Sequence, residues 1–258
     1  MSALASPGIR ILLPLGLALG GRPVLGPLDL AVEGGCITAL LGPSGSGKST
    51  LVRLAAGLMA LPQGAAVTAS DGLPLPGRTA WMAQQDLLVP WRDAIGNVTL
   101  GAHLRGVAPD LGRARDLLGR VGLAAADHAK PPAALSGGMR QRVALARTLM
   151  EDRPVVLMDE PFSAVDAPTR HRLQDLAARL LAGRTVLLVT HDPLEALRLA
   201  DRILVLSGTP AVPVAQPVPA GPPPRPARDA ALLAAQGLLL ERLAGAVPDV
   251  IPAGGAGA

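Results

Sequence analysis

The sequence predicts an α/β fold built around a parallel β-sheet. An apolar strand over residues 36–41 leads into a glycine-rich loop, and a helix over residues 50–57 follows it. A second apolar run over residues 155–158 ends in two adjacent carboxylates. Strands and helices also alternate from about residue 153 to about residue 207, as the crossovers of a parallel sheet require.

The glycine-rich loop has the pattern G-x-x-x-x-G-K-[ST], which binds nucleotide phosphates. Its glycines let backbone N–H groups turn toward the phosphates, its lysine neutralises them, and the hydroxyl after the lysine is a ligand for Mg²⁺. A glycine-rich turn without function does not explain the order strand, loop, helix. The loop predicts that ATP is bound by Gly42, Pro43, Ser44, Gly45, Ser46, Gly47, Lys48, Ser49 and Thr50.

The second strand delivers Asp159 and Glu160 to the carboxyl edge of the sheet, where such folds bind their ligands. We expect Asp159 to hold Mg²⁺ through water, together with Ser49. Glu160 would then polarise the water that attacks the γ-phosphate. An apolar strand ending in Asp-Glu is by itself an ordinary structural feature, and the phosphate loop upstream favours the catalytic interpretation.

Residues 135–142, Leu-Ser-Gly-Gly-Met-Arg-Gln-Arg, resemble the signature motif of ATP-binding cassette (ABC) ATPases. Ser136 is a natural N-cap for the following helix, and Gly137 and Gly138 leave amides bare at its positive end. In this family the motif binds the γ-phosphate of ATP held by the opposite subunit. The resemblance therefore implies a P-loop NTPase core, a helical subdomain that carries the motif, and a homodimer with ATP between its chains.

Three further positions resemble functional residues of the family. Gln84 matches the glutamine that approaches Mg²⁺ and the attacking water, with Gln85 as the alternative. Asp166 matches the D-loop, which touches the other subunit's site. His191 matches the switch histidine that bonds the γ-phosphate and orients water, although a histidine after a strand is otherwise a structural residue. The resemblance implies that Glu160, His191, Lys48 and Gln84 are catalytic, and that Ser49, Gln84 and Asp159 contact the metal.

The resemblance covers about residues 9–208 and predicts an ABC ATPase domain over residues 1–208. We expect a RecA-like core with an antiparallel β subdomain in residues 1–83 and 152–208, and a helical subdomain in residues 84–151. Prolines after Gly208 predict a stiff, extended linker over residues 209–228. Leucines at helical spacing predict a helix from Asp229 to Ala246 within a C-terminal segment, 229–258, which packs on the core or on a partner chain.

Composition favours a protein that binds at a membrane surface and does not span it. The longest early apolar run, residues 11–21, is shorter than the roughly 20 residues that a membrane span needs. A secretory signal is the alternative for this run, but its cleavage would remove the first strand. The net charge of +4 comes from dispersed arginines, without the basic patch or aromatic platform of a nucleic-acid binder. We expect a peripheral protein on the cytoplasmic face of the inner membrane.

Residues 87–91, with Asn97-Val98, are similar to importers of the nitrate, sulfonate and taurine group, and residues 82–86 resemble uptake subunits for the thiamine pyrimidine precursor hydroxymethylpyrimidine. The likeness implies an ATP-hydrolysing subunit that powers solute import through a separate transmembrane permease, served indirectly by a solute-binding protein. An ABC exporter or lipoprotein-release ATPase is the main alternative, and a non-transport ABC ATPase is another. A non-catalytic module is disfavoured because Glu160 and His191 are both present.

The chain departs from the family at the adenine contact, which is usually an aromatic residue upstream of the phosphate loop. The sequence has no tyrosine, and counting back about two dozen positions from Gly42 leads to Leu19. Leucine lacks the ring quadrupole that adds about 0.5–1.5 kcal/mol to stacking. We predict that Leu19→Tyr lowers the Kd for ATP measured by calorimetry. An unchanged Kd would mean that adenine is held elsewhere.

Overall fold

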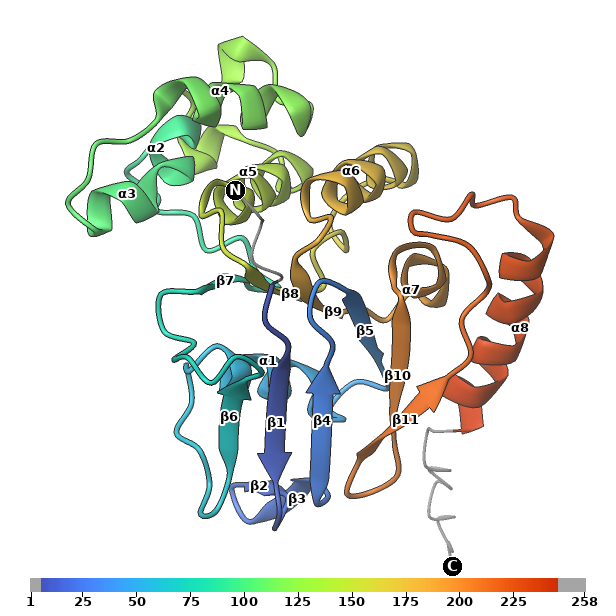
Figure 1. Ribbon diagram of the computed structural model, residues 1–258. Helices are drawn as coiled ribbons and strands as arrows, with labels where there is room; N and C mark the ends of the chain where they lie inside the picture. The colour runs from blue at the N-terminus through green and yellow to red at the C-terminus, as the bar shows by residue number, and fades with distance from the viewer. Residues whose placement is uncertain (1–5, 246–258) are drawn as a thin grey trace, which may run out of the picture.

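The computed structural model describes residues 6–245, which form a six-stranded sheet, a three-stranded sheet, a hairpin and a set of helices (Figure 1). The strands are β1 (Ile9–Leu13), β2 (Leu17–Leu19), β3 (Arg22–Leu25), β4 (Leu28–Val32), β5 (Ile37–Leu41), β6 (Ala66–Ala69), β7 (Thr79–Met82), β8 (Val155–Asp159), β9 (Thr185–Val189), β10 (Arg202–Ser207) and β11 (Val212–Gln216). The helices are α1 (Lys48–Ala55), α2 (Ala94–Val98), α3 (Leu100–Leu104), α4 (Leu111–Arg120), α5 (Gly137–Met150), α6 (Ala167–Leu180), α7 (Pro193–Leu199) and α8 (Ala230–Gly245). Two 3₁₀ turns, Ala125–Asp127 and Pro132–Ala134, precede α5.

The six-stranded sheet confirms the expected parallel core. Its strand order is β11-β10-β5-β9-β8-β7, and every neighbouring pair except β10–β11 is parallel. All five residues of β8 are buried, because its alternate side chains enter different hydrophobic clusters on the two faces of the sheet. Burial on both faces explains why this strand is continuously apolar instead of alternating.

An antiparallel sheet of order β4-β1-β6 forms the expected β subdomain. It shares one hydrophobic cluster with α1 and with one face of the six-stranded sheet. The helix α1 begins at Lys48, two residues before the expected start at position 50, so the lysine of the phosphate loop belongs to its first turn. The loop is thereby fixed to a helix that is packed within the core.

The helical subdomain contains α2, α3 and α4, which lie beside α5 at one end of the molecule (Figure 1). The apolar face expected for residues 110–121 is buried at Ala114, Leu117 and Leu118. Predicted N-caps are also confirmed. Ser136 accepts a hydrogen bond from the Met139 backbone N–H of α5, and Asp166 accepts one from the Thr169 N–H of α6.

The segment expected to be an extended linker differs from that expectation. Its residues 212–216 form β11, which pairs antiparallel with β10. Pro213 is tolerated there because β11 is the edge strand of the sheet, where one side of the strand needs no partner.

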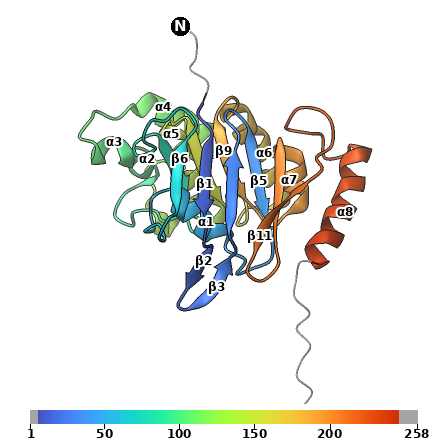
Figure 2. The ribbon, with the colours of Figure 1, turned by 60° about the horizontal axis from the view of Figure 1, so that its bottom comes forward.

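The helix α8 confirms the predicted C-terminal helix over residues 230–245, and residues 246–258 of the expected tail lie outside the described residues. Its Leu232 and Leu239 are buried against α7 and β10, whereas Leu233 and Leu240 are exposed. Figures 1 and 2 show α8 on the side of the molecule away from α2, α3 and α4. The sequence left open whether this helix packs on the core or on a partner chain, and in this structure α8 packs on the core of its own chain.

Candidate functional site

The carboxyl ends of four adjacent parallel strands bring several of the predicted site residues to one edge of the sheet. The phosphate loop follows β5, His191 follows β9 after one residue, Glu160 follows β8 directly, and Gln84 follows β7 after one residue. These segments are far apart in the sequence. Their meeting at one sheet edge is the arrangement by which open α/β sheets build ligand sites.

The phosphate loop is held tightly around Lys48, whose Nζ donates to the carbonyls of Gly42 and Pro43 at 2.8 Å each. Burial lowers the pKa of Lys48, and the carboxylates of Glu160 and Asp159 oppose that shift. The N-cap position of α1 is Gly47, which has a φ of 95° and supplies no side-chain cap. The first amides of α1 are therefore free of a capping side chain, as anion binding requires.

The hairpin β2–β3 packs beside this loop. A Cβ atom added at Gly47 would lie 2.7 Å from Leu25 Cδ2, so this glycine is required by close packing as well as by its positive φ. Leu19, the position proposed for the adenine contact, lies on β2 and is 41% exposed. Its side chain is accessible on the hairpin next to the phosphate loop.

The environment of Asp159 suits a magnesium ion. Asp159 is 3% exposed, and its Oδ1 atom is buried without a hydrogen-bond partner among the described residues. Burial raises the pKa of Asp159, while a hydrogen bond with the Ser49 side chain opposes the rise. A carboxylate and a hydroxyl are the oxygen ligands that Mg²⁺ prefers, and it commonly keeps several waters. The residues present therefore fit the metal that the phosphate loop implies.

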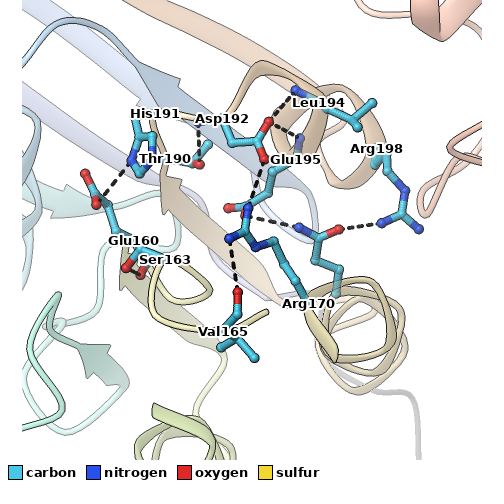
Figure 3. A network of polar contacts seen from close by, with 11 residues as sticks. Glu160, Ser163, Val165, Arg170, Thr190, His191, Asp192, Leu194, Glu195 and Arg198 are labelled. Carbon is cyan, nitrogen blue, oxygen red and sulfur yellow. Dashed lines mark hydrogen bonds and ion pairs between the residues drawn. The ribbon is translucent and has the colours of Figure 1, made fainter. Parts of the chain in front are cut away.

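Glu160 lies between two of the other predicted catalytic residues. Its Oε2 accepts a hydrogen bond from Gln84 Nε2 at 3.2 Å. The same oxygen lies 3.2 Å from His191 Nδ1 (Figure 3). The backbone of Glu160 has a φ of 49°, which is rare for a residue other than glycine. This conformation is held by its N–H, which donates to the Val189 carbonyl, and by Ser163 Oγ, which donates to its carbonyl. The structure thus brings Gln84, instead of its neighbour Gln85, to the carboxylate.

The signature motif and Asp166 stand apart from the phosphate loop of the same chain. Within the described part of the chain, no hydrogen bond or ion pair joins Ser136, Gly137, Gly138 or Asp166 to that loop. A Cβ atom added at Gly137 or Gly138 would meet neighbours at 3.9 Å and 3.5 Å, which are ordinary contacts. Packing inside this chain therefore gives no reason for two glycines at the start of α5.

Sequence reasoning missed the side chains that hold the segment after Gln84. Arg147 donates to the backbone carbonyls of Asp86 and Leu87, and Arg140 pairs with the Asp86 carboxylate at 2.9 Å. Both arginines belong to α5, the helix that the signature motif begins. No motif spacing signals these contacts, because their partners are more than fifty positions apart in sequence.

Asn97 holds the next part of this segment. It is fully buried, and its amide bonds the backbone of Val89, Arg92 and Asp93. Trp91 lies inside the loop that these bonds close and is 83% exposed. The loop is thus rigidly held while its largest apolar side chain faces outward.

A buried polar network lies behind His191 and was not predicted from the sequence (Figure 3). Glu195 on α7 is 4% exposed, and its Oε2 accepts a hydrogen bond from Gln174 Nε2 of α6 at 3.1 Å. Burial, aided by the negative charge of Asp192, raises the pKa of Glu195 to about 7, while Arg170 opposes the rise. Arg170 itself donates to the Val165 carbonyl at 3.0 Å, beside Asp166. The network joins the D-loop region to the loop that carries His191.

The raised pKa of Glu195 predicts a pH-dependent stability. Because the ordinary pKa of a glutamate is about 4.5, the stability that neutral Glu195 contributes is fully present below that pH and is lost as the pH rises from there through about 7. The side chain of the Glu195→Gln variant stays neutral at every pH. The Tm of this variant relative to that of the wild type should therefore be higher at pH 8 than at pH 5. Thermal unfolding followed by circular dichroism measures this, with the exposed Glu241→Gln as control. A difference in Tm that is the same at both pH values would contradict the assignment.

Comparison with known proteins identifies the family. The family model described as "ABC transporter" matches residues 25–163. An uncharacterised ABC transporter ATP-binding protein of Haemophilus influenzae is 44% identical over 90% of this chain and 97% of its own length. An aliphatic sulfonates import ATP-binding protein of Rhodococcus jostii is 49% identical over 71% of this chain and 73% of its own. A taurine import ATP-binding protein of Yersinia pestis is 42% identical over 74% of this chain and 76% of its own.

A solved structure agrees with this likeness. The chain is similar, with a TM-score of 0.68 and 29% identity, to an ATP-binding cassette solved as a dimer in a post-hydrolysis state bound to ADP and phosphate. The match covers 76% of this chain and 93% of that one. With the phosphate loop, the acidic strand and the signature motif all in their expected places, the chain belongs to the ABC transporter family of ATPases.

Proposed function

We propose that this chain is the ATP-hydrolysing subunit of an importer for a small solute of the taurine or aliphatic sulfonate kind. The observation that carries the proposal is the grouping of Lys48, Asp159, Glu160, Gln84 and His191 at one edge of the sheet, in a chain whose relatives are named for import. Those names favour import over the exporter alternative. The substrate class rests on the relatives alone, because a permease and its binding protein make the substrate contacts.

In the proposed reaction, the phosphate loop binds ATP through the first amides of α1. The ammonium of Lys48 and the signature amides offset the charge that develops on the γ-phosphate. Glu160 polarises the attacking water, and His191 and Gln84 hold the Glu160 carboxylate in place from two sides. Ser49, and Asp159 through water, would hold Mg²⁺, which would supply positive charge to offset that of the phosphates.

We further propose that two copies of the chain enclose the ATP. The glycines at 137 and 138 cost roughly 1 kcal/mol each at helix positions, and contacts inside this chain do not require them. Bare amides at the positive end of α5 fit a phosphate that comes from outside the chain. The dimeric form of the similar cassette supports the same assembly, in which Asp166 approaches the partner's site.

The proposed membrane partner is a permease that docks at the segment between Gln84 and Trp91. Trp91 is exposed, and the loop beneath it is fixed by Asn97. No helix within residues 6–245 is long and apolar enough to cross a membrane. We infer that the chain lies on the cytoplasmic face of the inner membrane and is bound there by the permease. Because Arg140 and Arg147 join this segment to α5, docking and the signature motif are mechanically connected.

The catalytic role of Glu160 predicts a trapped dimer. Glu160→Gln keeps the shape of the side chain but cannot act as a base, so ATP with Mg²⁺ should convert the variant to a stable dimer. Size-exclusion chromatography with light scattering measures the mass. Lys48→Ala should remain monomeric under the same conditions, because it loses the phosphate contact. Equal dimerisation of the two variants would contradict the scheme.

The importer assignment predicts a specific set of partners. The tagged full chain, purified from its native membrane, should carry a multi-span permease and a solute-binding protein identified by mass spectrometry. Trp91→Ala should lose the permease, while Leu233→Ala, which removes an exposed leucine from α8, should retain it. If wild type recovers only soluble proteins or nucleic acid, the transport role fails although the ATPase assignment stands.

A further inference from the structure

The part of the chain after β11, residues 217–245, is here called the C-terminal segment, and it contacts α7 through a buried arginine as well as through the leucines of α8. Arg225 precedes α8 and is 6% exposed. Its Nη1 donates to the carbonyls of Leu197 and Ala200, at 2.8 Å each, where α7 ends. A cation at this end of a helix satisfies carbonyls that lack partners within the helix and complements the helix dipole. Arg225 therefore fixes the carboxyl end of α7.

The contact continues through the backbone and into α6. The Arg225 N–H donates to the Arg198 carbonyl at 2.8 Å, and Arg198 Nε donates to the Arg225 carbonyl at 3.2 Å. Arg198, also buried, donates to the side chains of Gln174 and Asp175. Both sides of α7 are thus fastened at this end, one to the C-terminal segment and the other to α6.

The amino end of the same helix carries the switch histidine. Asp192 caps α7 by accepting hydrogen bonds from the Leu194 and Glu195 N–H groups, and its own N–H donates to Thr190 Oγ1 at 3.0 Å. His191 lies between Thr190 and Asp192, and its side chain is 65% exposed. Because packing does not hold this side chain, its distance to Glu160 depends on how the backbone at the start of α7 is placed.

We propose that Arg225 is a positioning residue for His191, which acts through α7 and makes the C-terminal segment part of the catalytic unit. This inference rests on the proposed role of His191 in hydrolysis. Because α7 is only seven residues long, loss of one of the two fastenings at its carboxyl end should alter the position of its amino end. A misplacement of about 1 Å at the reacting groups, caused by a mutation far from them, can lower rates about a hundredfold.

The test is a double-mutant cycle on ATP hydrolysis by the full chain, measured by phosphate release with Mg²⁺. Arg225→Met should lower kcat about tenfold and leave KM for ATP unchanged, because the phosphate loop is untouched. Arg225→Lys, which keeps the charge and can reach one carbonyl, should recover part of the rate. Arg228→Met, an exposed arginine three positions away, should behave as wild type.

The His191→Ala background separates positioning from a general structural role. There, Arg225→Met should cause no further loss of kcat, because the residue it positions is gone. An equal loss in both backgrounds, or a lower Tm with unchanged kcat, would overturn the positioning role. If His191→Ala alone keeps full kcat, the proposed role of His191 fails, and the positioning role with it. If Arg225→Met does not fold, Arg225→Lys is compared in the two backgrounds, with a loss of about threefold expected only when His191 is present.

Discussion

The site depends on the register of the parallel sheet. Val189 at the end of β9 pairs with Leu40 on one side and with Asp159 on the other, so three strands end at nearly the same level. Met82 of β7 extends this alignment through its pairing with Met158. A slip of one residue would turn every side chain of a strand to the other face, and the close packing of side chains on both buried faces resists such a slip. The loops that follow the strands therefore start from fixed, adjacent points.

Glu160 shows how that register is used. Its left-handed backbone costs of order 1–3 kcal/mol, and such conformations persist only where the surroundings hold them. Here the Val189 carbonyl and the Ser163 hydroxyl bond the two sides of the residue. The chain turns away from the strand direction directly after Asp159, so the two successive carboxylates have different neighbours. Asp159 stays buried near Ser49, while Glu160 lies between Gln84 and His191.

Arginines make several of the contacts between distant segments of this fold. The chain has few aromatic side chains. Three guanidinium groups donate to backbone carbonyls of other segments: Arg147 to the segment after Gln84, Arg170 to Val165 next to the D-loop, and Arg225 to the end of α7. A guanidinium presents five donors in a fixed plane, so one side chain can bind two carbonyls at once. These contacts hold the segment after Gln84 to α5, the D-loop region to α6, and the C-terminal segment to the end of α7.

The sequence by itself determined the parts whose signals are local. The phosphate loop, the acidic strand, the caps Ser136 and Asp166, and the helix over residues 230–245 all follow from spacing, burial pattern or capping chemistry within short windows. Local chemistry does not separate Gln84 from Gln85, because adjacent glutamines in a loop are alike, and it was the resemblance to the family that favoured Gln84. In the tertiary structure it is Gln84 that meets Glu160.

Only the tertiary structure decided the contacts between distant segments. It placed β11 at the sheet edge, buried Glu195 between α6 and α7, and brought Arg225 to the end of α7. None of these has a sequence signal, because a hydrogen bond between segments leaves no periodicity or spacing within either of them. The sequence thus determined which groups the chain has for nucleotide chemistry, and packing decided which distant residues hold them.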